Sequence, residues 1–355
     1  MKQLLDTPGA IRPGEELATE PLEAYLLAHV PGARGPMAVE QFPGGASNLT
    51  YLVRLGDMEL VLRRPPFGNR VKSAHDMGRE YRVLSKLHSV YAPAPRPVVY
   101  CEDESVLGAP FYCMERRRGV VLRRKLPEGL DLDPATVARL NRAFIDNLVM
   151  FHKIDYVAAG LGDLGKPLGY VGRQVEGWNK RYVACRTQDV KSMEFLMGWF
   201  PAHMPPQNAS SLVHNDYKFD NIMLDPEDLT KIVAVLDWEM CTLGDPMMDF
   251  GTVLAYWVEA GDPPALQTHA FGPTQLPGSM TRRELVDYYG QTSGFDVSNV
   301  LFYYAFGLFK VAVIIQQIYY RYVQGFTKDE RFARFDKQVA ALSDEACRAI
   351  QEGTY

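Results

Sequence analysis

The chain has 355 residues, of which 47% are hydrophobic and 23% are charged, and it carries a formal net charge of −5. A chain of this length can bury a large core and divides naturally into two lobes. The negative charge argues against nucleic acid as a partner, because the one basic cluster, residues 116–118 with 123–125, is too small to compete for a polyanion. The five cysteines have no Cys-x2-Cys spacing, so we expect no zinc site, no disulfide framework and a reducing, cytoplasmic location.

The amino-terminal region shows helix and strand signals in turn. Residues 1–12 lack a long apolar core, so no signal peptide is expected. Residues 19–22 have the pattern of a helix start, and the predicted helix reaches residue 30. Residues 39–42 alternate like a strand, and residues 49–55 resume β character after a turn. The turn contains Gly44, Gly45, Ser47 and Asn48. Such a turn lets backbone approach a phosphate, although Gly-Gly hairpins are common in any β protein.

A third strand is predicted over residues 58–64, where Val61 and Arg63 share one face. Hydrophobic residues at helical spacing predict a helix over residues 76–87, and this helix carries Glu80.

Two further strands are predicted over residues 97–101 and 110–115, which makes five in all. The second strand runs into four consecutive charged residues, 115–118, which are typical of a solvated linker. After this point the pattern becomes helical, with a strongly amphipathic helix predicted over residues 137–152.

The most informative stretch of the chain reads His-x-Asp-x4-Asn, from His214 to Asn221, between two short apolar runs. A hydroxyl that attacks a terminal phosphate needs an acceptor for its proton, and the phosphates need a divalent metal held by hard oxygen ligands. Asp216 suits the first task and Asn221 suits the second. This motif alone also arises by chance, so it needs support from linked motifs.

Two linked motifs follow. Asp237, at the end of the apolar run 232–236, is the expected second metal ligand. Residues 244–249 read Gly-Asp-Pro-x2-Asp and end at Asp249. Together with the first motif, they resemble the aminoglycoside phosphotransferase and choline kinase superfamily, which has a protein-kinase-like fold. A protein kinase is disfavoured, because too few residues separate Asp237 from residue 244 to form a usual activation segment.

The resemblance implies roles for these side chains. Asp216 would be the catalytic base, and Asn221 and Asp237 would hold Mg²⁺. Lys218 would neutralise charge on the transferred phosphate, with a solvated surface lysine as the alternative. His214 belongs to the same catalytic motif, and we favour a structural imidazole that braces the loop over a catalytic base.

Asp249 would support the catalytic loop, residues 214–221. An ionised group inside a protein must be paired or hydrogen-bonded. By resemblance, this carboxylate would accept backbone N–H groups of the catalytic loop.

The resemblance also places nucleotide binding in the amino-terminal third. Arg63 stands where kinases have a lysine held by an acidic residue, here Glu80, so the resemblance implies an ion pair between the two. The alternative is an ordinary surface pair with no role in a site. A guanidinium can fork onto phosphate and carboxylate together. The glycine turn would cover the phosphates, and the backbone of a hinge would meet the adenine base. The implied residues are Gly44, Gly45, Ser47 and Asn48 in the turn, and Met114, Glu115 and Arg116 in the hinge.

The implied architecture is an α+β, two-lobed, protein-kinase-like fold. Residues 1–115 would form the small nucleotide-clamping lobe, with a five-stranded antiparallel sheet plus a helix. Residues 116–132 would be the hinge or linker, and residues 133–355 the large, mainly helical lobe. The longest apolar stretch, residues 301–323, contains two charged residues and two amides, which favour a buried helix over a membrane span.

The predicted activity is that of a small-molecule kinase that transfers the γ-phosphate of ATP or GTP to a hydroxyl, with Mg²⁺. Residues 173–186 and 261–279 are expected to build the acceptor pocket. Motifs at residues 45–51 and 60–63 most resemble phosphotransferase domains found alone in bacteria or fused to acyl-CoA dehydrogenases, which favours a hydroxyacyl-CoA-type acceptor. The alternatives are an aminoglycoside or choline-like amino-alcohol acceptor and, in another class, a nucleotide-binding pseudokinase. A monomer or homodimer is expected.

Overall fold

The computed structural model describes residues 5–43, 48–67, 76–267, 271–327 and 329–355. Their contacts divide the chain into two compact units. The first unit is Met1–Val121, Val157–Leu161 and Asn221–Cys241, and the second is Leu122–Tyr156, Gly162–Asp220 and Thr242–Tyr355. The lobe boundaries expected from the sequence, at residues 115 and 132, stay a prediction.

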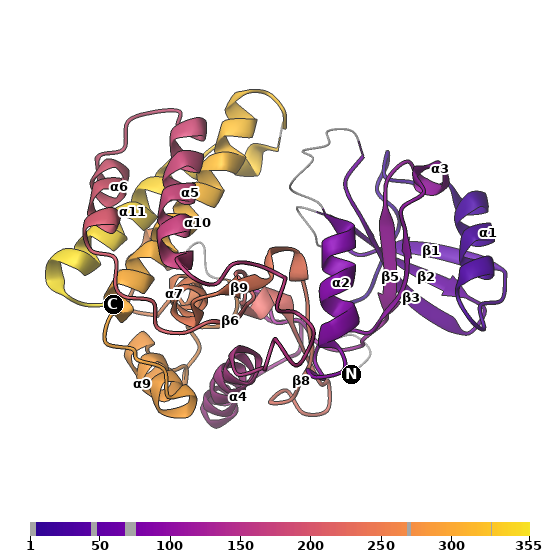
Figure 1. Cartoon of the computed structure of the whole chain (residues 1–355), viewed down its shortest axis with the longest axis horizontal. Helices are drawn as coiled ribbons and strands as arrows, with labels where there is room; N and C mark the ends of the chain where they lie inside the picture. The colour runs from indigo at the N-terminus through magenta and orange to yellow at the C-terminus, as the bar shows by residue number, and fades with distance from the viewer. Residues whose placement is uncertain (1–4, 44–47, 68–75, 268–270, 328) are drawn as a thin grey trace. The chain divides into compact units, whose positions relative to one another are not determined.

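The first unit contains a five-stranded antiparallel sheet in the order β1-β2-β3-β5-β4. Its strands are β1 (Met37–Gln41), β2 (Leu49–Leu55), β3 (Met58–Arg64), β4 (Pro97–Cys101) and β5 (Phe111–Glu115). Helices α1 (Thr19–His29) and α2 (Met77–Leu87) lie on opposite faces of this sheet (Figure 1). The five predicted strands and the helix beside them are confirmed, with strand ends within two residues of the prediction.

The two faces of β3 serve different purposes, because successive side chains point to opposite sides of a strand. Leu60 and Leu62 belong to the hydrophobic core that contains Leu22 and Leu26 of α1. Arg63 points to the other face and meets Glu80 of α2. The alternation predicted for this strand therefore brings Arg63 to the α2 side of the sheet.

The first unit also holds a short ribbon formed by β7 (Ile222–Leu224) and β8 (Ile232–Val235), which pair antiparallel. The 3-10 helix η3 (Trp238–Met240) follows β8, and α3 (Glu104–Leu107) precedes β5. Met223 and Ala234 pack against Val121, so the ribbon has a small apolar core of its own.

The second unit is mainly helical, as predicted for the larger lobe. Its helices are α4 (Pro134–His152), α5 (Tyr170–Cys185), α6 (Lys191–Ala202), α7 (Pro246–Tyr256), α8 (Pro264–Gln267), α9 (Arg282–Ser293), α10 (Val300–Val323) and α11 (Phe335–Glu352), with η4 (Glu330–Phe332). Strands β6 (Ser211–Val213) and β9 (Thr242–Gly244) pair antiparallel. The 3-10 helix η2 (Phe219–Asn221) carries the chain from the second unit into the first.

Helix α10 is the centre of the second unit. Among the described residues, it is the one helix long and apolar enough to cross a membrane by length and composition, and 78% of its most apolar window is buried in the structure. Lys310 and Gln316 on this helix are buried and hydrogen-bonded. The predicted buried helix is confirmed.

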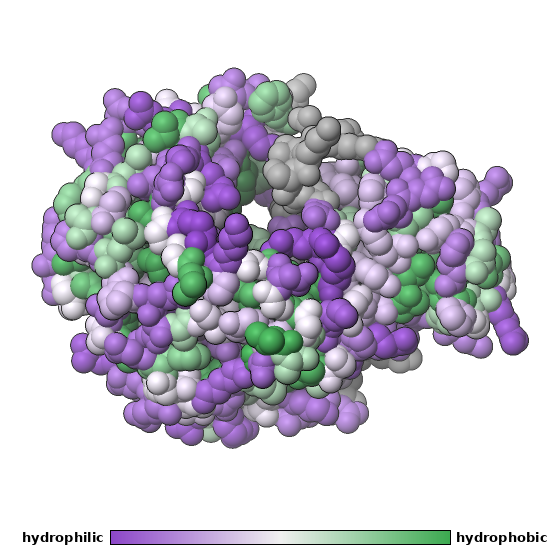
Figure 2. Space-filling view, in the orientation of Figure 1, coloured by the Kyte–Doolittle hydropathy of each residue, from purple (hydrophilic) through white to green (hydrophobic). Residues whose placement is uncertain are grey.

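Hydrophobic and hydrophilic residues are interspersed on the molecular face shown in Figure 2. The large hydrophobic side chains that are exposed come from many different elements of the chain. Single exposed hydrophobic residues of this kind are normal on a protein surface and need no partner to explain them.

Candidate active site

The predicted catalytic loop, residues 214–221, follows β6 in the second unit and is hydrogen-bonded by α7. Both carboxylate oxygens of Asp249 accept backbone N–H groups, from His214 at 2.6 Å and from Asn215 at 2.7 Å. Burial raises the pKa of Asp249, but the His152 side chain and the loop amides outweigh it and hold the pKa below its ordinary value. The predicted support of the loop by this carboxylate is confirmed.

Asp216 lies next in the loop and has two hydrogen-bond donors from other side chains. Lys218 Nζ lies 2.9 Å from Oδ1 and 2.8 Å from Oδ2, and the Tyr256 hydroxyl donates to Oδ1 at 2.7 Å. Burial acts to raise the pKa of Asp216, yet the charge of Lys218 and these hydrogen bonds lower it overall. The carboxylate is therefore ionised at neutral pH and able to accept a proton.

Tyr256 is a site residue that sequence reasoning missed. It ends α7, whose residues are all buried, so no local pattern set it apart. Burial, followed by the Asp216 charge, raises the pKa of Tyr256 well above its usual value, which keeps its hydroxyl a donor. Its ring packs edge-to-face on Phe271 at 4.8 Å, and Lys218 Nζ lies 4.9 Å and 5.3 Å from the centres of the two rings.

His214 is fully buried in the second unit. Its Nδ1 accepts the backbone N–H of Asp216 at 3.3 Å, and its ring contacts Phe151 and Tyr217 edge-on. These contacts agree with a bracing role, because the nitrogen nearest the proposed base is already used to hold that residue's backbone.

In the first unit, Arg63 lies between two carboxylates. Its Nε lies 3.2 Å from Glu80 Oε2, and its Nη2 donates to Asp237 Oδ1 at 2.9 Å. Burial alone would lower the pKa of Arg63, but the two carboxylates raise it, so the guanidinium stays charged. The predicted pair of Arg63 with Glu80 is confirmed, and Glu80 is only 1% exposed, which excludes the surface-pair alternative.

The two predicted metal ligands, Asn221 and Asp237, lie at the same end of the β7–β8 ribbon. Ile222 pairs with Val235, and the Leu236 N–H donates to the Asn221 carbonyl at 2.8 Å. An amide oxygen and a carboxylate suit Mg²⁺, which usually takes one or two protein ligands and completes its octahedron with water and phosphate. Within the described ranges no group of three or more His, Cys, Asp or Glu could hold a metal, so a cage built from protein alone is not offered there.

Two non-glycine residues in the described part of the chain have a positive φ. One precedes the proposed base, and the other is a predicted metal ligand. Asn215, before the proposed base, has φ 68°, and Asp237 has φ 65°. Residues other than glycine rarely adopt this backbone conformation, and it persists at functional sites where surrounding contacts hold it in place. Backbone strain therefore marks the same two segments that the motifs single out.

The predicted nucleotide-binding residues belong to the first unit. Gly44, Gly45 and Ser47 lie outside the described residues. Asn48 is buried and donates to Glu239 Oε2 at 2.9 Å.

Met114, Glu115 and Arg116, the residues expected to meet the adenine base, also belong to the first unit. Met114 is buried in β5. The Glu115 N–H donates to the Arg96 carbonyl at 2.9 Å, and Arg116 pairs with Glu59 at 2.9 Å. The Glu115 amide is thus already used, so any adenine contact in this stretch falls to other backbone groups.

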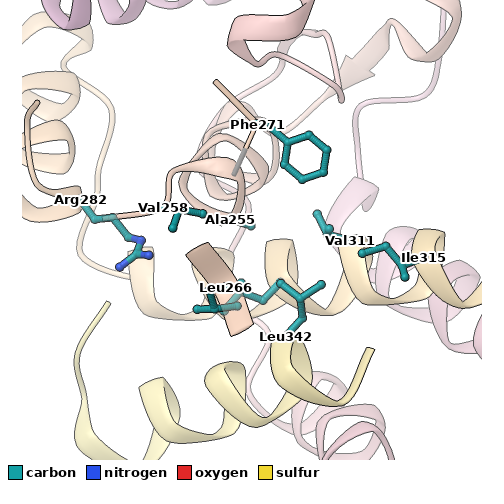
Figure 3. A pocket seen from close by; sticks show the side chains of 9 residues that line it. Ala255, Val258, Leu266, Phe271, Arg282, Val311, Ile315 and Leu342 are labelled. Atoms are coloured by element: carbon teal, nitrogen blue, oxygen red, sulfur yellow. The ribbon is translucent and has the colours of Figure 1, made fainter. Parts of the chain in front are cut away.

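A pocket lies in the second unit, and Phe271 is part of its lining (Figure 3). It is lined by Ala255, Val258, Leu266, Phe271, Arg282, Leu308, Val311, Ile315 and Leu342. The predicted specificity segment, residues 261–279, contributes Leu266 and Phe271. The predicted helix 173–186 contributes none of this lining, and its Trp178 and Tyr182 are buried instead.

Comparison with known proteins gives the family. The family described as "Phosphotransferase enzyme family" matches residues 38–284. Acyl-CoA dehydrogenase family member 10 of Mus musculus is 37% identical over 318 residues, which are 89% of this chain and 29% of that protein. The chain spans less than half the length of the curated relatives it matches.

Solved structures agree. A candidate aminoglycoside phosphotransferase from Ralstonia eutropha JMP134 is 35% identical, with a TM-score of 0.77, and the match covers 94% of this chain and 99% of that chain. The GDP and kanamycin complex of APH(2″)-IIia, at 14% identity and a TM-score of 0.60 over 92% of this chain and 98% of that chain, shares the fold. The chain therefore belongs to the phosphotransferase enzyme family, and it has a protein-kinase-like fold.

Proposed function

We propose that the protein transfers the γ-phosphate of ATP or GTP to a hydroxyl of a small acceptor. The observation that carries this proposal is the ionised, hydrogen-bonded Asp216 in the family's catalytic loop. Asp216 accepts the proton of the attacking hydroxyl, and Lys218 offsets the charge of the carboxylate and of the phosphate. Positioning and charge neutralisation supply most of the catalysis in reactions of this kind.

The donor side of the reaction is assigned to the first unit. Asn221 and Asp237 would hold Mg²⁺, which when bound neutralises phosphate charge. Arg63, fixed by Glu80, would bind phosphate oxygens in place of the usual kinase lysine. The GDP bound by APH(2″)-IIia supports a nucleotide as donor.

The acceptor is proposed to carry an apolar portion beside its reactive hydroxyl. The pocket is lined mostly by aliphatic and aromatic side chains, and its Phe271 packs on Tyr256, which in turn binds Asp216. A hydroxylated acyl chain of the hydroxyacyl-CoA type fits these properties. One relative is named an acyl-CoA dehydrogenase family member, which supports an acyl compound as the class of acceptor.

Two alternatives differ from this proposal in observable ways. An aminoglycoside or choline-like acceptor is a cation and favours acidic pocket walls, whereas the one charged side chain that lines the described pocket is Arg282. A pseudokinase would bind nucleotide without turnover. The ionised Asp216 argues against it, whereas Arg63 in the place of the lysine keeps this alternative open.

The test is a two-stage assay on the full chain. Thermal shift with Mg-ATP and Mg-GTP measures nucleotide binding, and mass spectrometry then detects phosphorylated products in pools of hydroxyacyl-CoAs, amino alcohols and aminoglycosides. We expect a gain of about 80 Da in hydroxyacyl compounds, the mass of one added phosphoryl group. Product in the aminoglycoside or amino-alcohol pools alone would favour the first alternative, and nucleotide binding with no product in any pool would favour the pseudokinase.

A further inference from the structure

Lys310 is a buried amine that none of the motifs includes. It lies in the middle of α10 and is 3% exposed. Its Nζ donates to the backbone carbonyl of Asn215 at 2.7 Å and lies 3.4 Å from Thr252 Oγ1. A residue 95 positions further along the chain therefore binds the catalytic loop directly, one residue before Asp216.

Asn215 needs such contacts because of its backbone conformation. Its φ of 68° is unfavourable for a residue with a side chain. Three elements hold it: Asp249 of α7 accepts its N–H at 2.7 Å, Tyr170 of α5 donates to its Oδ1 at 3.0 Å, and Lys310 of α10 donates to its carbonyl. The N–H, the carbonyl and the Oδ1 of Asn215 are thus each bound by a different helix of the same unit.

Packing alone does not explain a lysine here. Burial of an ammonium group is costly, and hydrophobic residues of similar volume often serve stability as well or better. Burial lowers the pKa of Lys310 to about 8, although the Asp249 and Asp216 carboxylates act in the opposite direction. The Lys310 ammonium group donates to the carbonyl of the peptide group that joins Asn215 to Asp216.

We propose that Lys310 is a positioning residue for the phosphotransfer reaction: by binding the Asn215 carbonyl it holds the left-handed turn that aims the Asp216 carboxylate. This inference rests on the proposed function, in which Asp216 is the base. Lys310 itself touches neither substrate in this scheme. Its effect reaches the reaction only through the loop.

The first test measures the loop without any substrate. Hydrogen–deuterium exchange of peptides covering residues 213–221 is compared in the wild type, Lys310→Met and Gln316→Met. Gln316 is a matched control, because it is buried on the same helix and donates to a backbone carbonyl, that of Cys185, away from the loop. We expect exchange about tenfold faster in Lys310→Met and unchanged in Gln316→Met. Equal exchange in the two variants would overturn the proposal.

A second variant guards against misfolding of the first. Tyr170→Phe removes the contact to the Asn215 side chain and leaves the charge of Lys310 in place. It should accelerate exchange of the same peptides in the same direction. Wild-type exchange in Tyr170→Phe would show that the turn does not depend on these contacts, and so would count against the proposal.

The second test measures turnover as ADP formed from Mg-ATP in the presence of the hydroxyacyl-CoA pool. Lys310→Met should lower kcat about tenfold and leave KM for the nucleotide within about threefold, as expected for loss of an interaction that acts on the reacting group. In an Asn215→Gly background, where glycine adopts the turn freely, the same change should cost much less. An undiminished effect in that background would overturn the proposal. A wild type without any turnover would count against the proposed function, and the exchange measurement would still decide the role of Lys310.

Discussion

At the scale of single residues, the proposed base is defined by a competition between burial and hydrogen bonds. Burial favours a neutral carboxyl group, whereas the Lys218 charge and the Tyr256 hydroxyl favour the carboxylate. The second effect prevails, so Asp216 has a lowered pKa. The donors that achieve this can be removed one at a time.

Removal of the Tyr256 hydroxyl should shift the pH dependence of the reaction. A base works only when ionised, so activity is lost as the pH falls through the pKa of Asp216. Tyr256→Phe removes one donor to the charged form and therefore raises that pKa. A hydrogen bond to a charged group contributes about 1.5–3 kcal/mol, so the acidic limb of the kcat profile should move up by about one pH unit. A profile that stays in place, or moves to lower pH, would contradict the assignment of this hydrogen bond.

Arg63 can be tested through stability alone. Arg63→Met leaves the buried Glu80 without its cation, and breaking a buried pair in this way costs about 3–5 kcal/mol. Arg63→Met/Glu80→Met removes both charges and should regain most of that loss. Urea denaturation of the full chain measures both variants. A loss below about 1 kcal/mol in the single variant is typical of an exposed pair and would contradict the buried geometry.

At the scale of elements, the position of Lys310 depends on how closely α10 packs on α7. The two helices cross at Gly251 and Gly307, and a Cβ atom at position 307 would lie 2.2 Å from the Gly251 carbonyl oxygen. A side chain there would push two backbones apart. Because α7 carries Asp249 and α10 carries Lys310, the crossing sets the positions of two side chains that hydrogen-bond the proposed catalytic loop.

Gly307→Ala should therefore destabilise the protein, by about 1–3 kcal/mol, as overpacking of a tight core does. Gly198→Ala is the matched control. A Cβ on that glycine of α6 meets nothing within 4 Å, so alanine should stabilise its helix by about 0.5–1 kcal/mol. Chemical denaturation compares the two variants. Equal and favourable effects would mean that the α7–α10 crossing has room that the structure does not show.

Elements with a regular pattern were predictable from the sequence, and single contacts between distant helices were not. The alternation in β3 correctly predicted that Arg63 shares a face with Val61, opposite the face of Leu62, and there Arg63 meets Glu80. Tyr256 and Lys310 were missed because each lies in a largely apolar helix and outside the motifs of the sequence. No local spacing distinguishes a tyrosine that binds a carboxylate from one that fills a core.

The candidate site shows the same division. The short motifs gave the proposed base, Asp216, and the proposed metal ligands, Asn221 and Asp237, because phosphoryl transfer calls for a proton acceptor and oxygen ligands for a metal ion. The pocket was only partly foreseen. Its lining comes from α7, α10, α11 and the segment with Phe271, and no sequence window contains that combination.

At the scale of the whole molecule, the buried amine should make stability depend on pH. Lys310 has a pKa of about 8 in the folded chain, against an ordinary value of 10.5. Between these two pH values the unfolded chain therefore binds more protons than the folded chain. The free energy of unfolding should therefore rise from about pH 8 toward about pH 10 relative to Lys310→Met, by on the order of 1–2 kcal/mol. Denaturation curves of both proteins over this range measure the difference. A constant difference would show that the amine titrates normally.

The central claim is that Asp216 is the base of a phosphotransferase, and one comparison tests it most directly. Product formation and Mg-ATP affinity are measured side by side for the wild type and for Asp216→Asn, which keeps the size of the side chain and removes its charge. We predict a loss of roughly 10² to 10⁴ in kcat, the usual contribution of a general base, with the Kd for Mg-ATP within about threefold of the wild type. Undiminished turnover in Asp216→Asn would contradict the account.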